Sequence, residues 1–391
     1  MKKIIQIILL LLILFSVFGI YTIYQERYIP PDIVLSTKEW YDYSGVIHIH
    51  TKYSDGGGTI NEITEAARKL GLQFILIADH NTLQPFLDGV EGWNSGILVL
   101  AGIEISSSVG HLLYYDAGSL FKNYDPDKVE KLLQSNPGLD TLLVIAHPFH
   151  PRMSFNHWVF PGYGGIELFN GDVQWRDNSL SGILLALFGS LWFPDASNHL
   201  INYPVRSVDQ WNKLLNSRFV AGIGSADAHS NLKITKNFHL NFPSYSTAFR
   251  YVRTHIITKT PFTGDLAIDR TSVIRAIRQG HTYIELGNFC DPKGFMFTVQ
   301  QDSFITLPGD TYSLKETVKL FIQSPDTTNI FIRLFKDGVL LQEVWNKKML
   351  IYNAELPGVY RAEVFQVRDA VPLFSPGSFP WIISNPIFIV K

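Results

Sequence analysis

The sequence predicts an α/β barrel protein with a smaller β domain behind it and a membrane anchor in front. Apolar strand-like runs alternate with helix-like segments from Gly45 onward, as an α/β barrel requires. Beyond Cys290 short alternating runs replace this pattern, and the chain begins with a long apolar segment. We therefore expect four parts: an anchor at 1–24, a linker at 25–43, the barrel at 44–288 and an antiparallel β-sandwich at 289–391.

The amino-terminal segment has the features of a transmembrane helix. Lys2 and Lys3 precede an apolar run at 4–24 without a charged residue, and about 20 residues match the hydrocarbon core of a bilayer. No small-x-small cleavage site follows, so we expect an uncleaved signal anchor. Because lysines stay on the cytoplasmic side, this orientation predicts a single-pass cell-membrane protein with its barrel on the extracytoplasmic side.

The composition of the 391-residue chain limits the kinds of partner it can have. Hydrophobic residues make up 46% and the net charge is −2, which favours a large packed core and argues against nucleic-acid binding. The single cysteine, Cys290, cannot form an internal disulfide and is expected to be a buried apolar residue.

The regular elements follow from local signals. Thr59 is a capping residue for a helix over 59–70, which Gly71 ends, and Asp269 is expected to cap a helix over 269–279. Further helices are expected at 125–133 and 208–215. Strands are expected at 74–78, 165–170, 317–322, 330–335, 358–365 and 381–390.

A histidine pair follows the first barrel strand. In the sequence HIHTKYSDG at 48–56, His48 and His50 have strand spacing and are expected to point to the same side. Two imidazoles can then reach one cation, while Asp55 on the following loop can supply an oxygen ligand. A His-x-His pair on its own would be attributed to chance, so the metal-site interpretation depends on matching residues elsewhere in the chain.

Four more apolar runs end in the same kind of residue. They lead to His80, to Glu104 with His111 seven residues later, to His147, and to Asp227 with His229. Each time a carboxylate or imidazole stands where a buried strand would end. Five such coincidences are hard to attribute to composition, so we expect these side chains to meet at one end of the barrel.

Together, and in this order, these motifs resemble the PHP (polymerase and histidinol phosphatase) superfamily of metal-dependent hydrolases over roughly 44–285. The resemblance implies a distorted (β/α)7 barrel with up to three metal ions. It implies one ion near His48, His50, Glu104 and Asp227, a second near Glu104, His111 and His147, and a third near Asp55, His80 and His229. Asp227, His229 and Glu104 are the expected catalytic residues.

The charge of such a site predicts its chemistry. Three carboxylates against about +6 from three divalent ions leave a positive pocket that attracts a small anionic substrate. Bound ions also lower the pKa of water toward neutrality, which favours phosphoester hydrolysis with Zn, Mn or Fe. Lys52, His150 and Arg152 lie in adjacent loops and are expected to bind the substrate. Glu167 is a candidate to orient a liganding imidazole.

Two other functions fit parts of the sequence. A PHP domain with a carboxyl-terminal β extension resembles an exported branch that includes amide and carbamate hydrolases, whose pocket the apolar stretch 180–193 could line. That stretch would otherwise be a helix packed over the site or a segment at the membrane surface. A non-catalytic envelope-binding protein is the third alternative, which nine converging metal ligands disfavour.

Overall fold

The computed structural model describes residues 40–116, 129–134, 138–189, 198–235, 238–301, 304–326, 328–368 and 377–391. The predicted anchor at 1–24 and most of the predicted linker therefore lie outside the described residues. Among the residues that are described, no helix is both long and apolar enough to cross a bilayer.

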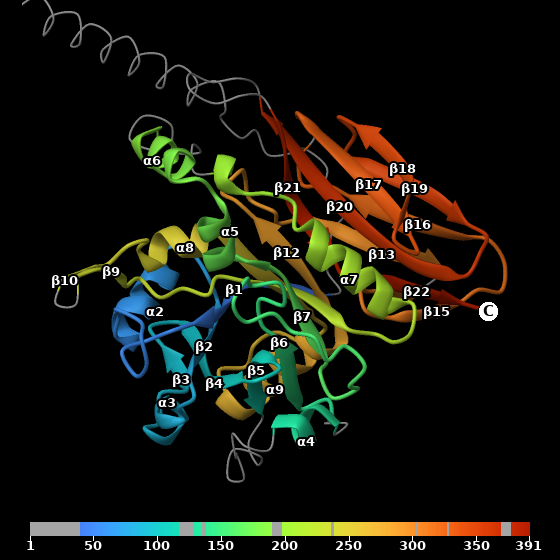
Figure 1. Ribbon diagram of the computed structural model, residues 1–391. Coiled ribbons are helices and arrows are strands. Elements are labelled where there is room, and N and C mark those ends of the chain that lie inside the picture. Colours follow the sequence, from blue (N-terminus) through green and yellow to red (C-terminus); the bar gives the residue numbers. More distant parts are fainter. Residues whose placement is uncertain are drawn as a thin grey trace, which may run out of the picture.

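A sheet of mostly parallel strands forms the barrel (Figure 1). Its parallel strands are β1 (Tyr41–Ile49), β2 (Phe74–His80), β4 (Ile97–Ser107), β6 (Thr141–Ile145), β7 (Gly165–Asn170) and β8 (Ala221–Ser225). Strand β1 begins at Tyr41, so the end of the predicted linker belongs to the barrel. The short β3 (Gly92–Asn94) pairs with β4.

The barrel departs from a regular βα repeat at two places. Strand β5 (Gly110–Asp116) runs antiparallel between β4 and β6, because a tight turn joins it to β4 and leaves no room for a crossover helix. On the other side of β1, strand β11 (Val252–Thr258) pairs antiparallel with β1, and β12 (Thr282–Leu286) pairs antiparallel with β11. Strands β9 (Leu232–Thr235) and β10 (Phe238–Leu240) form a separate hairpin.

Helices lie around the barrel and at its ligand-bearing end (Figure 1). They are α2 (Ile60–Lys69), α3 (Gln84–Leu87), α4 (Val129–Gln134), α5 (Gly171–Asp177), α6 (Leu180–Gly189), α7 (Val205–Leu215), α8 (Tyr245–Tyr251) and α9 (Leu266–Gln279). Because helices pack on one side and barrel side chains fill the other, β2 is buried along nearly its whole length and reads as a continuous apolar run.

Each expected helix has a counterpart, but α7 begins at Val205 and α9 at Leu266, earlier than expected, and residues 125–128 of the helix expected at 125–133 lie outside the described residues. Thr59 caps α2 in a capping box with Glu62, as expected. In α9 the N-cap is Asp265, whose carboxylate accepts from the amides of Ala267 and Ile268, and the helix begins three residues before Asp269. Asp269 instead lies buried in the first turn and accepts from the amides of Thr263 and Gly264.

Side chains close the barrel along strand β8. The Thr254 hydroxyl accepts from the Gly224 amide at 3.1 Å and donates to its carbonyl at 2.7 Å. The Asn385 side chain does the same for Gly222, at 2.8 and 2.9 Å. Both positions need glycine, since a Cβ at either would lie 2.5 Å from a neighbouring side chain. Beyond β8 the chain pairs with the end of β1 through an Ile49–Ala228 bridge.

The carboxyl-terminal part is a β-sandwich. One sheet contains β13 (Met296–Gln301), β14 (Phe304–Thr306), β16 (Val318–Gln323) and β19 (Met349–Ala354). The other contains β15 (Thr311–Ser313), β17 (Ile330–Lys336), β18 (Val339–Trp345), β20 (Gly358–Arg368), β21 (Gly377–Ser384) and β22 (Ile387–Val390). An apolar core that includes Leu320, Ile332 and Trp381 lies between them.

Two features of the sandwich differ from the prediction. Strand β15 pairs with β22 in parallel, so the sandwich is not wholly antiparallel. The strand expected at 381–390 is two strands, separated at Asn385. Strand β21 also pairs with β12 of the barrel, so the second sheet continues into the barrel sheet. The two parts are joined by a β-ladder as well as by the chain.

A buried charged cluster ties β1, β11 and β12 together. His255 lies between Asp42 and Glu285, with Nδ1 2.8 Å from Asp42 Oδ1 and Nε2 3.1 Å from Glu285 Oε2. The Tyr283 hydroxyl donates to Asp42 Oδ2 at 2.6 Å. Burial alone would lower the pKa of His255, but the two carboxylates raise it to about 9.

We predict that His255 makes stability depend on pH. Its folded-state pKa lies above its usual value of 6.5, so its contribution is complete below pH 6.5 and is lost as pH rises through about 9. At about 1.4 kcal/mol per pKa unit this amounts to about 3 kcal/mol. The difference in free energy of unfolding between wild type and His255→Gln should therefore shrink between pH 6 and 10 in urea titrations. A constant difference would contradict the assignment, and the exposed His239→Gln provides the control.

Candidate metal centre

The end of β1 carries the first two candidate ligands in an irregular backbone. His48 has a φ of 64°, and the register between β1 and β2 shifts between Ile47 and Ile49. The expected regular strand alternation at His48 and His50 is therefore wrong. Both rings nevertheless reach the same place, with each Nε2 atom 3.2 Å from Glu104 Oε2.

Left-handed backbone recurs at the candidate ligands. Besides His48, His147 has a φ of 26° and Asp227 a φ of 47°. Such conformations are unfavourable for residues with a side chain and persist where the surroundings fix them. Three of the nine predicted ligands thus occupy strained positions, which is typical of functional sites.

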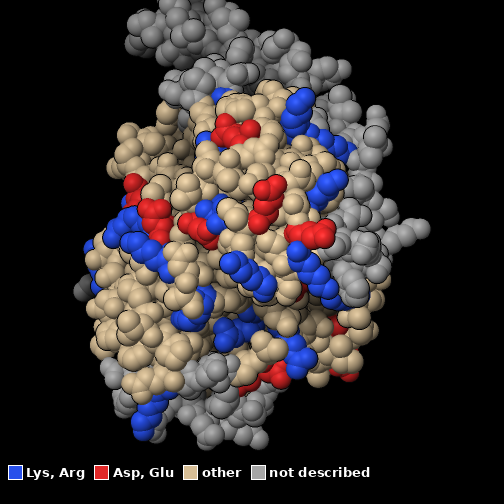
Figure 2. Space-filling view, turned by 90° about the vertical axis from the view of Figure 1, so that its right-hand side faces the viewer, with Lys and Arg blue, Asp and Glu red and all other residues tan. Residues whose placement is uncertain are grey.

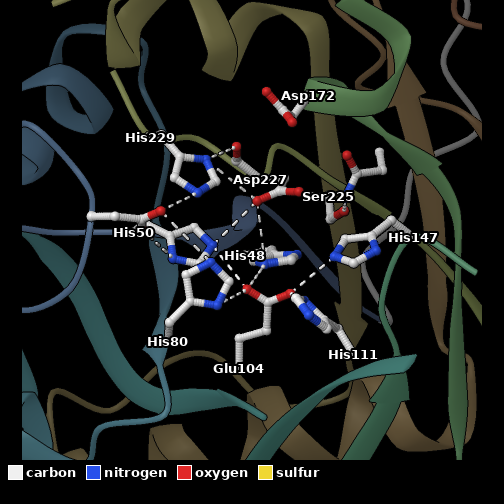
Figure 3. Close-up of polar contacts among 12 residues, drawn as sticks. His48, His50, His80, Glu104, His111, His147, Asp172, Ser225, Asp227 and His229 are labelled. Atoms are coloured by element: carbon white, nitrogen blue, oxygen red, sulfur yellow. Dashed lines mark hydrogen bonds and ion pairs between the residues drawn. The ribbon is translucent and has the colours of Figure 1, made fainter. Parts of the chain in front are cut away.

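Glu104 lies at the centre of the site (Figure 3). Its Oε1 atom is 2.7 Å from His111 Nδ1 and 2.9 Å from His147 Nε2. Its Oε2 atom faces His80 Nδ1 at 2.9 Å, in addition to the two β1 histidines. One buried carboxylate therefore contacts five imidazoles that come from β1, β2, β5 and the loop after β6.

A second group of ligands surrounds Asp55 on the loop after β1. Asp55 Oδ1 is 3.4 Å from His50 Nδ1, and Oδ2 is 3.5 Å from His229 Nε2 and 3.8 Å from His80 Nε2. The rings of His50 and His229 stack with centroids 4.0 Å apart. His50 and His80 thus lie between the Asp55 and Glu104 groups, which makes the site one continuous cluster.

Several buried ligand atoms in this cluster have no hydrogen-bond partner. They are His48 Nε2, both ring nitrogens of His50, His80 Nδ1, His147 Nδ1, Glu104 Oε2 and Asp227 Oδ1. Leaving buried polar atoms unsatisfied costs roughly 1–3 kcal/mol each. Cations among these atoms would satisfy them, so the residues fit divalent metal ions.

The candidate ligands group somewhat differently from the expected partition. The three sets with ligand atoms close together are His50, Asp55, His80 and His229; His48, His50 and Glu104; and His80, Glu104 and His111. The first two resemble the expected third and first ions. In the remaining set His80 takes the place expected for His147, because the His80 ring also faces Glu104.

Opposite charges shift the pKa values of the ligands. Burial would raise the pKa of Glu104, but His48 and the other imidazoles hold it well below its usual range. His48 is held well above its usual pKa by Asp227 and Glu104, against the effect of burial. The Asp55 hydrogen bond and the Asp227 charge likewise overcome burial and raise the pKa of His229 to about 9. Without a metal, protons therefore balance the carboxylates.

Residues behind the ligands fix their orientation. Glu167, at the end of β7, accepts from His48 Nδ1 at 2.7 Å, which is the contact expected for it, and from the His147 amide at 2.6 Å. The first bond turns His48 Nε2 toward Glu104. Asp79 accepts from the amide and hydroxyl of Thr51, both at 2.8 Å, and so holds the loop that carries Asp55.

Sequence reasoning did not assign Asp79 or Asn170 to the site. Asp79 directly precedes His80, and that position was the available signal. Asn170 ends β7 and donates to Glu167 and Asp227, but an asparagine at a strand end is also an ordinary turn residue.

The cluster opens into a cavity of about 790 Å³. His150 and Arg152, for which substrate binding is a prediction, line it, and burial together with the charge of His147 lowers the pKa of His150. Lys52 does not line it, because its side chain points to the exposed surface, 3.8 Å from Glu62. The lining also contains residues that the sequence did not single out. Asp172, Val173, Arg176 and Asp177 form a wall from α5, and Ser106 and Met153 also line the cavity.

The apolar stretch at 180–193 is a helix, α6, over its first ten residues. No described residue of α6 lines the cavity, and residues 190–193 lie outside the described part of the chain. The described part of the stretch therefore does not form the apolar pocket considered from the sequence.

An α/β barrel with clustered imidazoles and carboxylates at the carboxyl ends of its strands is typical of a metal-dependent protein. Residues 47–169 match the sequence model of the PHP domain family. This part of the barrel is therefore similar to the PHP domain, and its His/Asp/Glu cluster is suited to divalent metals.

Other comparisons give partial likenesses. An uncharacterized protein of Methanocaldococcus jannaschii is 29% identical over 159 residues, which cover 36% of this chain and 87% of that protein. A solved two-domain protein of Bacteroides vulgatus, containing a predicted PHP-like metal-dependent phosphoesterase, is 15% identical with a TM-score of 0.39, covering 90% of this chain and 99% of that one. A predicted metal-dependent phosphoesterase of Bifidobacterium adolescentis is 17% identical with a TM-score of 0.31, covering 56% and 96%.

We predict that metal binding releases protons. The raised pKa values of His48, His80, His147 and His229 mean that the metal-free site holds protons at pH 7, and an imidazole must lose its proton to bind a metal. Calorimetric titration with Zn²⁺ at pH 7, in buffers of different ionisation enthalpy, should show release of more than one proton per chain. Affinity should rise with pH toward 9.

The control for this measurement is His255→Gln, which removes a raised pKa outside the site and should leave the number of released protons unchanged. A heat of binding that is the same in every buffer would contradict the ligand assignment.

Proposed function

We propose that the protein is a metal-dependent hydrolase that acts on a phosphoester of a small anionic molecule. The observation that carries the proposal is the group of buried, unpartnered ligand atoms at the base of a cavity whose rim carries His150 and Arg152. Divalent ions bound there, up to three of Zn, Mn or Fe, would supply an activated water and neutralise the phosphoryl oxygens.

The protein's own residues would divide the work. His48, His50 and His80 would hold the ions together with Glu104, which stays ionised because its pKa is held low. Asp227 directs Oδ1 toward the same place and is the group suited to accept a proton from the attacking water. His229 is ordered by its Nδ1 contact with the Asp227 carbonyl at 2.9 Å.

The rim of the cavity would bind the substrate. The Arg152 guanidinium can pair with non-reacting phosphoryl oxygens. His150, with its lowered pKa, is neutral at pH 7 and can donate a hydrogen bond without adding charge. Pro151, Met153 and Val173 also line the cavity, and their apolar side chains favour an amide or carbamate with an apolar leaving group as the second candidate substrate.

We predict hydrolysis of p-nitrophenyl phosphate or its bis-ester by the metal-loaded full chain, and loss of this activity with a chelator. His50→Ala and Asp227→Ala should lower turnover by at least about 100-fold and reduce bound metal, because each removes a ligand shared by the central group. Initial rates and elemental analysis provide the measurements. His239→Ala, outside the cavity, is the control.

Turnover of an aryl carbamate without either phosphate activity would remove the phosphoester proposal in favour of the second candidate. Unchanged metal content in His50→Ala and Asp227→Ala would contradict the metal site itself.

We also propose that the chain is tethered to the cell membrane by residues 4–24, with the barrel on the extracytoplasmic side. The uncharged apolar run behind Lys2 and Lys3 supports this. We also propose that the protein does not bind nucleic acid, because such proteins usually carry a basic excess or patch. Here the net charge is −2, and acidic and basic side chains are interspersed on the face in Figure 2.

The tether predicts that the full chain stays with membranes after an alkaline carbonate wash. A chain that lacks residues 2–24 should be released, because the apolar run supplies the attachment. Immunoblots of both fractions measure this, and protease added from the extracytoplasmic side should digest the barrel. Release of the full chain by carbonate would contradict the tether.

A further inference from the structure

Asn170 stands where strand β7 ends and helix α5 begins. It is the N-cap of α5, and its side-chain Oδ1 accepts a hydrogen bond from the Val173 amide at 3.0 Å. Because an amide side chain has one acceptor end and one donor end, this cap fixes which way the group faces. The donor end, Nδ2, must point away from α5 and into the barrel.

The donor end of Asn170 joins two buried carboxylates. Nδ2 is 2.8 Å from Glu167 Oε2 and 3.1 Å from Asp227 Oδ2. Glu167 and Asp227 are 1% and 6% exposed, so two negative groups share a site from which water is largely excluded. A neutral donor between them reduces the cost of burying both.

This contact determines which oxygen of Asp227 remains available. Since Oδ2 is held by Asn170, Oδ1 turns toward the histidines of β1, at 3.4 Å from His48 Nε2 and 3.2 Å from His50 Nε2. Oδ1 has no hydrogen-bond partner. The same amide also fixes Glu167, whose other oxygen accepts from His48 Nδ1 and orients that ring.

Asn170 also connects the metal cluster to the wall of the cavity that α5 forms. The helix that it caps carries Asp172, Val173 and Arg176, which line that wall. Asp172 and Arg176 form an ion pair one turn apart on α5. Asn170 therefore makes three contacts: with α5, which lines the cavity; with Asp227, a candidate metal ligand; and with Glu167, which orients His48.

We propose that Asn170 is a positioning residue of the metal centre: it fixes Asp227 and Glu167 through its amide nitrogen, independently of its role as a helix cap. The inference rests on the proposed metal-dependent function. It predicts that the loss of the amide nitrogen alone weakens metal binding, by about 10- to 100-fold, the range typical for groups that orient metal ligands.

A pair of substitutions separates the two roles. Asn170→Ser keeps an oxygen that can accept from the Val173 amide but removes Nδ2, whereas Asn170→Ala removes both. Asp265→Ala is the matched control, since it removes the N-cap of α9, which lies outside the cavity. Affinity is measured by chelator competition with Zn²⁺ on the full chain, and geometry by the visible absorption of the Co²⁺-loaded protein.

We expect Asn170→Ser and Asn170→Ala to lose metal affinity by a similar factor and to change the Co²⁺ spectrum in the same way. Both variants should lower the melting temperature of the metal-free protein, and Asn170→Ala by more, because it also loses the cap. Asp265→Ala should lower the melting temperature as well, but should keep wild-type affinity and spectrum.

Wild-type affinity and spectrum in Asn170→Ser would overturn the inference and leave the proposed function intact. Equal loss of affinity in Asp265→Ala would also overturn it, by showing that any lost cap loosens the site. A wild-type chain that binds no metal would instead defeat the proposed function, and this inference with it.

Discussion

The contact of one buried carboxylate with five imidazoles constrains the rest of the structure. Glu104 is almost completely shielded from water, and an ionised carboxylate in such a place must be paired with positive charge and hydrogen-bond donors. His48, His50, His80, His111 and His147 provide those partners. They come from four different parts of the barrel, so the strands that carry them must end at the same level.

Much of the surrounding structure can be understood as support for that arrangement. The bulge at His48 and the left-handed backbone at His147 and Asp227 place side chains where a regular strand would not. Glu167 and Asn170 hold these positions through hydrogen bonds to a ring nitrogen, a backbone amide and a carboxylate, and Asp79 fixes the adjacent loop through Thr51. Strained conformations persist here because several independent contacts fix each one.

The positions of His48, His80, Glu104, His147 and Asp227 could be predicted because each follows an apolar run, whereas Asp55, His111 and His229 were recognised by their proximity to these residues in the sequence. A buried strand such as the one expected at 74–78 is recognisable without knowledge of its neighbours, although β2 continues through Asp79 to His80. The exact geometry of His48 and His50 could not be predicted, since a bulge depends on the pairing partner, β2. The resemblance to the PHP family supplied the expectation of several ions.

Other errors arose where proximity along the chain was taken for proximity in space. Lys52 is two residues from His50 but its side chain turns outward to Glu62, whereas Arg176 is remote in sequence and lines the cavity. Asp265 and Asp269 are equally plausible caps by residue type, and only the burial of the second distinguishes them. The ladder between β12 and β21 joins residues about 100 positions apart, which no local pattern reveals.

The way the barrel is sealed affects how the two halves of this protein can change independently. Asn385, from the sandwich, satisfies both backbone groups of Gly222, and β21 covers the edge of β12. Cutting the chain after residue 288 would expose an unpaired strand edge beside the segment that carries Asp227. The barrel is therefore no independent module, and a relative without the sandwich would need another way to cover that edge.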